Sequence, residues 1–266
     1  MRYAFITVLT SACVLASASS AQVAPDRSYS WPSATAAVQA QTLEQRIPPP
    51  QGFTRVPVAP GSWGAWLRGL PMKPQGAPVL TFTGTPKWRQ DVHVAVVDID
   101  VGKRDLQQCA DAIMRLRGEW LFAAGRLRDI AFNDTDGKRL RFSARRDQGY
   151  ASFRKYMDYV FAYAGTYSLE RELKPVALAD ISIGDVFIKG GFPGHAVLVA
   201  DMVENAATGE KRLLLLQSYM PAQDMHVLRN PASTGRSPWY AASFDGDLIT
   251  PEWTFPSRAL RRWPDR

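Results

Sequence analysis

The chain has 266 residues, of which 46% are hydrophobic and 21% are charged, with a formal net charge of +7. These fractions are ordinary for a globular protein. The basic residues are scattered, and the sequence contains no helix-turn-helix, zinc-finger or single-strand-binding signature, which argues against nucleic acid as a partner. We therefore expect a globular protein that does not bind nucleic acid.

Residues 1–21 have the three-part layout of a secretory signal peptide. A positive start at Arg2 precedes an apolar run over residues 3–18, and small residues lead to a cleavage site after Ala21. The run is shorter than the ~20 residues that span a bilayer. Lipidation at Cys13 is disfavoured because the apolar run continues past it. We expect a periplasmic or secreted protein with no integral membrane segment after the signal is removed.

Removal of the signal peptide would take Arg2 and Cys13 with it, leaving a net charge of +6 (+7 − 1) and one cysteine, Cys109. A single cysteine cannot form an internal disulfide, so an exported protein keeps it buried or uses it. A positive balance outside the cytoplasm favours anionic surfaces such as cell-envelope polymers. The sequence predicts a cell-envelope polymer or peptide as the partner.

Residues 22–50 are rich in Ala, Ser, Gln and Pro and end in three prolines, which predicts a flexible arm. Residues 51–266 are long enough for a single domain. Strands are predicted over 79–82 and 92–99. Helical spacing of apolar residues then predicts a helix that opens at Asp105, with Asp105 as its cap, and continues to about residue 121.

A second helix is predicted over 153–163, and 169–173 continues helically. The chain then turns to strands over 185–188, 195–201 and 212–217, with Gly209 in the hairpin between the last two. The tail from 237 to 266 has no regular pattern. Helices followed by a mostly antiparallel sheet predict an α+β fold.

Three residues have the spacing and context of a thiol catalytic site. Cys109 lies at the start of the strongest helix, where backbone N–H groups and the helix dipole favour a thiolate. His195 opens a strand after the loop Gly190-Gly191-Phe192-Pro193-Gly194, and Gln217 ends the next strand. Cysteine, imidazole and an orienting amide are the parts needed for acyl transfer through a thioester. We predict catalytic roles for Cys109, His195 and Gln217.

Each of these residues also has a structural alternative. Cys109 falls on the apolar face of its helix and could be a core residue. His195 could be a strand histidine with a structural hydrogen bond. Asp201, Gln223 or Asp224 could orient the ring in place of Gln217.

Substrate contacts are predicted at two places. Gln108, together with backbone N–H groups at the helix start and Gln107, could hold an oxyanion. Asp111 shares a helical side with Arg115, which is also the pattern of a solvated or ion-paired face. Aromatic residues could line a substrate groove, or simply pack an irregular surface: Trp63, Trp66, Trp239, Tyr240 and Trp253.

Two resemblances follow from these motifs. The stretch Gly184-Asp185-Val186-Phe187-Ile188 followed by Gly194-His195-Ala196-Val197-Leu198-Val199 resembles the sheet segment of NlpC/CHAP-type cell-wall amidases and endopeptidases. This resemblance implies a papain-like fold and an activity on peptidoglycan stem peptides. In that family Asp or Ser usually stands next to the cysteine, where this chain has Gln108 and Ala110.

The second resemblance covers most of the chain. Three segments are similar to a family of secreted bacterial proteins known as domain of unknown function 4846. They are Cys109-Ala-Asp-Ala-Ile-Met-Arg-Leu-Arg, Gly190-Gly-Phe-Pro-Gly-His195-Ala and Gln217-Ser-Tyr-Met-Pro-Ala-Gln-Asp224. This resemblance implies export and a shared fold, but it implies no particular activity.

The leading functional hypothesis is a papain-like thiol hydrolase that cleaves an amide or ester bond in the cell envelope. The competing hypothesis is a non-catalytic module on the same fold that binds envelope glycan or peptide. A glycosidase using Asp111 and Glu119 is disfavoured, because eight residues along one helix separate them by roughly 12 Å. No cofactor is implied, and His93 and His226 lack metal-ligand spacing, so no metal is expected.

Overall fold

The computed structural model describes Met1 and residues 29–31, 41–235 and 237–264. The predicted signal peptide therefore lies, apart from Met1, outside the described residues. The helices are α1 (Leu43–Arg46), α2 (Trp63–Arg68), α3 (Cys109–Ala123), α4 (Tyr150–Tyr163) and α5 (Thr166–Glu172). The first strands are β1 (Thr54–Arg55), β2 (His93–Val96), β3 (Ala131–Asn133), β4 (Arg139–Arg141), β5 (Lys174–Pro175) and β6 (Val186–Lys189). The remaining strands are β7 (His195–Glu204), β8 (Lys211–Gln217), β9 (His226–Leu228), β10 (Tyr240–Ala241), β11 (Asp247–Ile249), β12 (Thr254–Pro256) and β13 (Leu260–Arg262).

A nine-stranded sheet with antiparallel pairings forms the centre of the fold. Its strand order is β2-β9-β8-β7-β6-β13-β5, with β1 paired to β7 and β10 paired to β8. The hairpin between β7 and β8 turns at Gly209, whose φ of +71° suits glycine. The start of β7, the end of β8 and the start of β9 lie at the same end of these adjacent strands, so His195, Gln217 and His226 are neighbours.

The sheet is covered on both faces, which explains the uninterrupted apolar run of β7. Ala196 and Leu198 pack into the core shared with α3 and α4, whereas Val197 and Val199 pack into a second core. This second core lies under the hairpin β11–β12 and the C-terminal segment. Side chains alternate between the faces of a strand, so a strand buried on both faces is apolar throughout.

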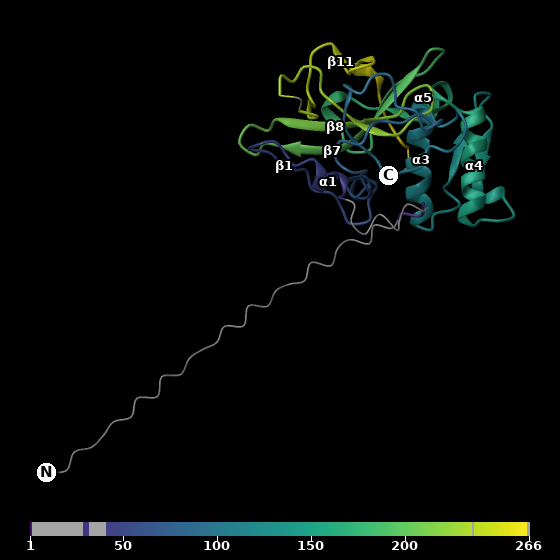
Figure 1. Cartoon of the computed structure of the whole chain (residues 1–266), viewed down its shortest axis with the longest axis horizontal. Coiled ribbons are helices and arrows are strands. Elements are labelled where there is room, and N and C mark those ends of the chain that lie inside the picture. Colours follow the sequence, from purple (N-terminus) through teal and green to yellow (C-terminus); the bar gives the residue numbers. More distant parts are fainter. Residues whose placement is uncertain (2–28, 32–40, 236, 265–266) are drawn as a thin grey trace.

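Helix α3 lies against the sheet, and α4 packs beside it at one end of the molecule (Figure 1). The chain is thus a mixed α+β protein with a largely antiparallel sheet and the cysteine-bearing helix packed on it, as predicted at that level.

Several boundaries differ from the prediction. Helix α3 begins at Cys109 instead of Asp105, because the Asp105 carboxylate accepts from Gln108 and from the Ala222 backbone N–H. The segment 79–82 forms isolated bridges instead of a strand, and the tail beyond residue 237 supplies β10 to β13. Compact structure begins before residue 51, since Leu43 in α1 is fully buried.

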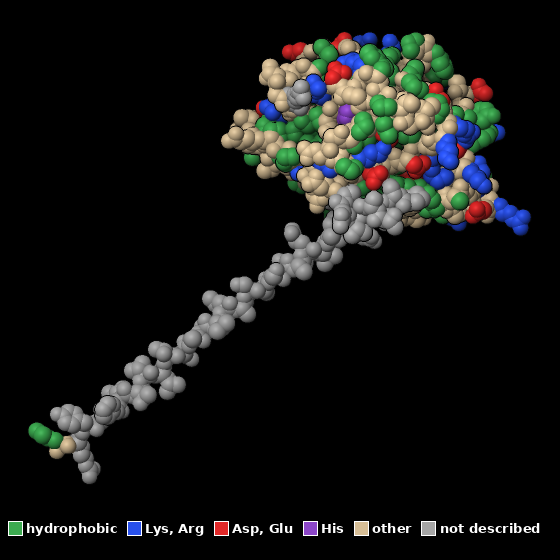
Figure 2. Space-filling model, viewed as in Figure 1, with side chains coloured by type: hydrophobic (Ala, Val, Ile, Leu, Met, Phe, Trp, Pro, Cys, Tyr) green, Lys and Arg blue, Asp and Glu red, His purple; other side chains and the backbone are tan. Residues whose placement is uncertain are grey.

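The viewed surface carries both signs of charge. Basic side chains gather toward the α4 end with acidic ones among them (Figure 2). Across the residues described, no helix is both long enough and apolar enough to span a bilayer.

Candidate functional site

Cys109 is the first residue of α3 and is 6% exposed. Its sulfur interacts with the backbone N–H groups of Ala110 and Ala196, and Ala196 directly follows His195 in β7. The thiol therefore lies where the helix start meets the first residues of that strand. The sequence prediction that Cys109 and His195 belong to one site is consistent with this position, although their catalytic roles stay predictions.

The predicted thiolate at the helix start is wrong for the structure at rest. Burial raises the pKa of the Cys109 thiol to about 12, and the nearby Asp111 carboxyl raises it further, which outweighs the pKa-lowering backbone N–H groups. The free energy needed to remove a thiolate from water is larger than the stabilisation that a few backbone N–H dipoles provide. Cys109 is consequently a neutral thiol in this closed arrangement.

His195 and Gln217 are in direct contact. The His195 Nε2 atom lies 2.9 Å from Gln217 Oε1, and both side chains are buried. The other expected orienters are engaged elsewhere: the Asp201 carboxylate binds Arg55 and Arg68, and the Asp224 carboxylate binds Lys73. Gln223 donates to Pro221 O. Of the four orienters considered from the sequence, Gln217 is the one that holds the imidazole.

The hydrogen-bond network fixes the tautomer of His195. The Gln217 Nε2 group donates to Glu252 Oε2 at 2.7 Å and to His226 Nε2 at 3.2 Å. Because a carboxylate only accepts, the amide nitrogen must face Glu252, and Oε1 must face His195. His195 therefore donates from Nε2, and the neutral ring keeps its lone pair on Nδ1.

Glu252 and Lys87 extend this network and were not anticipated from the sequence. Glu252 Oε1 binds Lys87 Nζ at 2.7 Å, with side-chain exposures of 7% and 3%. Lys87 also lies 5.0 Å from the centroid of the Tyr219 ring. Both charged residues come from segments without a periodic pattern. The only local signal was an acidic residue beside Trp253 in the aromatic tail.

Aromatic rings enclose His195. Tyr219 lies 4.7 Å away between ring centroids, Trp253 5.4 Å and Phe255 5.8 Å, with Phe255 stacked at 24°. Burial lowers the pKa of His195 to about 4; the hydrogen bond that His195 donates to Gln217 opposes this shift, and the charge of Lys87 reinforces it. His195 is therefore neutral at pH 7 and presents Nδ1 as a base.

His226 makes the stability of the network depend on pH. Burial lowers its pKa to about 3, and its Nδ1 donates to Asp224 O. The unfolded chain binds a proton at this histidine below pH ~6.5, whereas the folded chain does not, so stability falls as the pH drops below that value. From pH 7 to pH 5 this histidine should remove about 2 kcal/mol. Urea unfolding of wild type and of His226→Gln at both pH values checks this. Between pH 7 and pH 5 the free energy of unfolding of the variant should fall by about 2 kcal/mol less than that of wild type.

A pH sensitivity of the His226→Gln variant equal to that of wild type would show that His226 does not carry the effect. The variant comparison is needed because burial also raises the pKa of Asp111 and Glu119, and buried acids shift stability in the opposite direction.

Gln108 and Asp111, both predicted to contact substrate, take part in the helix start. The Gln108 backbone N–H donates to Asp111 Oδ2 at 3.2 Å, and the Gln108 side chain donates to Asp105. Asp111 is buried, and its Oδ1 has no partner within the described part of the chain. Burial raises the pKa of this carboxyl well above its usual range. Gln107 is held by Arg115, so neither glutamine side chain is directed at an oxyanion here.

The expected aromatic groove is not formed by Trp239 and Tyr240. Trp239 is buried and its indole N–H donates to Pro48 O, while the Tyr240 hydroxyl donates to Arg229 O. Trp63 and Trp66 are also buried in the core. The sequence showed that aromatic residues were abundant here, but their burial depends on how β10 pairs with β8. Only Trp253 of this set contacts His195.

Within the described ranges, no three His, Cys, Asp or Glu side chains come together as metal ligands would. The fold and site define a mixed α+β protein with a buried histidine–glutamine pair at one end of the central strands, near the start of the cysteine-bearing helix. The family model of the domain of unknown function (4846) matches residues 43–146 and 142–262, so the chain belongs to that family. No curated protein and no solved structure matches the chain.

Proposed function

We propose that this protein is an exported papain-like thiol hydrolase that cleaves an amide or ester bond in the cell envelope, with peptidoglycan stem peptides as the leading substrate. The hydrogen bond from His195 Nε2 to Gln217 Oε1 carries the proposal, because it directs an unprotonated Nδ1 away from the orienting amide. The order of a helix-start cysteine, a strand histidine and a glutamine on the next strand supports it. Periplasmic or secreted localisation is part of the same proposal.

The chemistry is acyl transfer. The Cys109 sulfur attacks the carbonyl carbon while its proton passes to His195 Nδ1, and the carbonyl oxygen becomes an oxyanion next to backbone N–H groups at the start of α3. His195 then returns the proton to the leaving amine or alcohol as the C–N or C–O bond breaks. Water, deprotonated by His195, hydrolyses the thioester and restores the thiol.

The burial of Cys109 and His195 requires that substrate binding opens the site. Their pKa values of about 12 and about 4 describe a neutral pair, so proton transfer belongs to the attack itself instead of preceding it. Gln217, Glu252 and Lys87 act as positioning residues, since they reach the reacting atoms only through His195.

Digestion of purified peptidoglycan sacculi tests this proposal. The wild-type protein should release soluble fragments or new amino groups, measured by liquid chromatography and mass spectrometry. Cys109→Ala should lose this activity completely, while Thr208→Ala in the β7–β8 hairpin should keep it. Equal release by Cys109→Ala and wild type would refute the assignment.

One observation favours the non-catalytic alternative, an envelope-binding module: the resting site is closed and its thiol is neutral. Co-sedimentation with sacculi, without release of any fragment and unchanged by Cys109→Ala, would identify this alternative. Replacement of Trp63, Trp66 or Trp239 would not test it, because these buried indoles stabilise the core.

A further inference from the structure

A basic segment packs against α4. Residues 126–147 hold seven Lys or Arg and four Asp, a formal charge of +3 (7 − 4) in a chain whose total is +7. The segment runs from the turn after α3 through the hairpin of β3 and β4, and the Tyr156 hydroxyl of α4 donates to Leu140 O at 2.9 Å. A large part of the net positive charge therefore lies in one short stretch of the chain.

Two arginines of this segment line a hollow of about 390 Å³ and have no partner among the described residues. Arg128 and Arg141 are exposed, and neither forms an ion pair or a side-chain hydrogen bond with any residue that the structure describes. Arg141 lies opposite Ala131 in the β3–β4 pairing, and Ala131 also lines the hollow. Directly opposed residues of antiparallel strands project from the same face, so a small neighbour leaves the Arg141 guanidinium open. Both arginines are available to an anion from solution.

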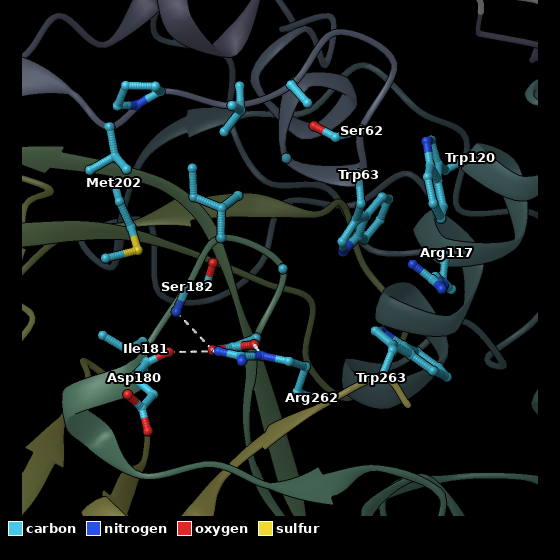
Figure 3. A pocket seen from close by; sticks show the side chains of 18 of the residues that line it. Ser62, Trp63, Arg117, Trp120, Asp180, Ile181, Ser182, Met202, Arg262 and Trp263 are labelled. Atoms are coloured by element: carbon cyan, nitrogen blue, oxygen red, sulfur yellow. Dashed lines mark hydrogen bonds and ion pairs between the residues drawn. The ribbon is translucent and has the colours of Figure 1, made fainter. Parts of the chain in front are cut away.

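The other arginines of the hollow are already engaged. Two of them pair with carboxylates that also line it: Arg126 with Asp129 at 2.7 Å, and Arg139 with Glu172. Arg117 is 2% exposed, and its guanidinium carbon lies 4.6 Å from the ring centroid of Trp120 and 5.4 Å from that of Trp263. Figure 3 shows Arg117 between these two indoles, beside the neighbouring cavity. The charge open to a partner in the hollow is thus that of Arg128 and Arg141.

Unpaired charge continues beyond the hollow. Lys138 in the hairpin turn and Arg146 after β4 are exposed, and within the described ranges they likewise have no ion pair. Of the nearby acids, Asp134 accepts from two backbone N–H groups of its own turn and Asp147 from one. Four exposed cationic groups exceed what one small anion neutralises, which favours an extended anionic partner.

Two exposed aromatic side chains adjoin the hairpin turn. Tyr159 and Tyr163 on α4 are 44% and 54% exposed, with ring centroids 4.7 Å apart. The Thr135 backbone N–H and hydroxyl donate to Tyr163 O at 2.9 and 3.0 Å, which fixes the end of α4 beside the turn. Tyrosine, with an apolar ring and a polar tip, is enriched where proteins meet the headgroup region of a bilayer. These rings favour a lipid surface over a soluble polyanion.

We propose that the face formed by the hollow and the hairpin turn binds the anionic phospholipid surface of an envelope membrane, with Arg128 and Arg141 contacting lipid phosphates. A planar guanidinium donates two parallel hydrogen bonds to a phosphate, which suits arginine to this group. Attraction to an anionic leaflet requires only clustered cations near its surface, so no segment needs to cross the bilayer. This membrane attachment is independent of the proposed hydrolysis.

Co-sedimentation with vesicles tests this proposal. The chain from Gln22 is used, because the apolar run of residues 3–18 would itself bind lipid. The vesicles contain phosphatidylcholine alone or in equal parts with phosphatidylglycerol. Wild type should sediment only with the phosphatidylglycerol vesicles, and sodium chloride should release it. Arg128→Gln/Arg141→Gln should lower the affinity roughly 25-fold, at roughly fivefold for each cation near the surface.

A matched variant separates this face from net charge. Lys211→Gln/Arg258→Gln removes the same charge from two exposed side chains outside the hollow and should lower the affinity no more than about twofold. Equal losses in the two double variants would overturn the proposal, as would equal binding to both kinds of vesicle or binding to neither. Tripolyphosphate that binds wild type as tightly as the vesicles do would also overturn it, by identifying a soluble phosphate ligand.

Two further measurements keep the result interpretable. Urea unfolding should be unchanged in both double variants, because none of the four side chains has an ion-pair partner in the part of the chain that the structure describes. Cys109→Ala should sediment with the vesicles as wild type does, so a failure of membrane binding and a failure of hydrolysis are separate results.

Discussion

Replacing Lys87 with methionine is expected to lower the free energy of unfolding by about 3–5 kcal/mol. The Lys87–Glu252 pair joins two nearly inaccessible side chains at 2.7 Å, and removing the ammonium leaves a buried carboxylate without its counter-charge. Glu252 also accepts from Gln217, so the effect should extend to the imidazole. Urea unfolding at pH 7 measures the change.

Two variants control this prediction. The double variant Lys87→Met/Glu252→Gln should recover much of the loss, because a neutral amide oxygen can still accept from Gln217 without a buried charge. Arg212→Met removes an exposed pair with Glu210 and should cost no more than about 1 kcal/mol. If Lys87→Met cost as little as Arg212→Met, the buried pair would not support the site as argued.

The residues that sequence reasoning could find are those carried by regular elements. Cys109 follows from helical spacing, and His195 and Gln217 from the ends of two strands joined by a hairpin at Gly209. Once β7 and β8 pair in that hairpin, the ends of the two strands meet, so a local pattern brings together residues 22 positions apart. Lys87 and Glu252 come from irregular segments, and nothing periodic predicts that such segments meet across the fold.

Burial was the property that the sequence could not supply. Asp111 and Arg115 had the spacing of an ion-paired or solvated helix face, yet both are buried. Arg115 pairs instead with Glu119 at 2.6 Å, under α4 and the segment around Asp100. The same uncertainty applies to Trp239 and Tyr240, whose side chains point into the two cores instead of a groove. A helical pattern gives the relative direction of side chains but not what covers them.

Cys109 shows how burial, which the sequence does not give, reverses the expected direction of the shift in the thiol pKa. The position at the helix start was a sound reason to expect a lowered pKa, since the dipole contributes up to about 2 kcal/mol in favourable geometries. Desolvation of a thiolate is a larger effect than this when the sulfur is enclosed. Cys109 therefore rests as a neutral thiol and His195 as a neutral imidazole, so any activation must accompany the opening of the site.

Alkylation of Cys109 by iodoacetamide should accordingly be slow and should rise roughly tenfold per pH unit from pH 6 to pH 10 without a plateau. With a pKa of about 12, the thiolate fraction at pH 7 is about 10³-fold below that of an exposed cysteine, whose pKa is about 8.5. In urea, where the chain is unfolded, alkylation at pH 7 should be about 10³-fold faster than in the folded protein, and its rate should level off above pH 9. Mass spectrometry of the Cys109 peptide measures both profiles in one sample series.

His195→Ala separates the two possible resting states. In a neutral pair the imidazole does not activate the thiol, so removing it should not slow alkylation at any pH. A plateau below pH 8 in wild type, or rapid reaction near pH 5 that His195→Ala abolishes, would instead establish a preformed thiolate–imidazolium pair. That outcome would mean that the charge of the imidazolium, hydration of the sulfur, or both offset the cost of burial that raises the pKa of the thiol.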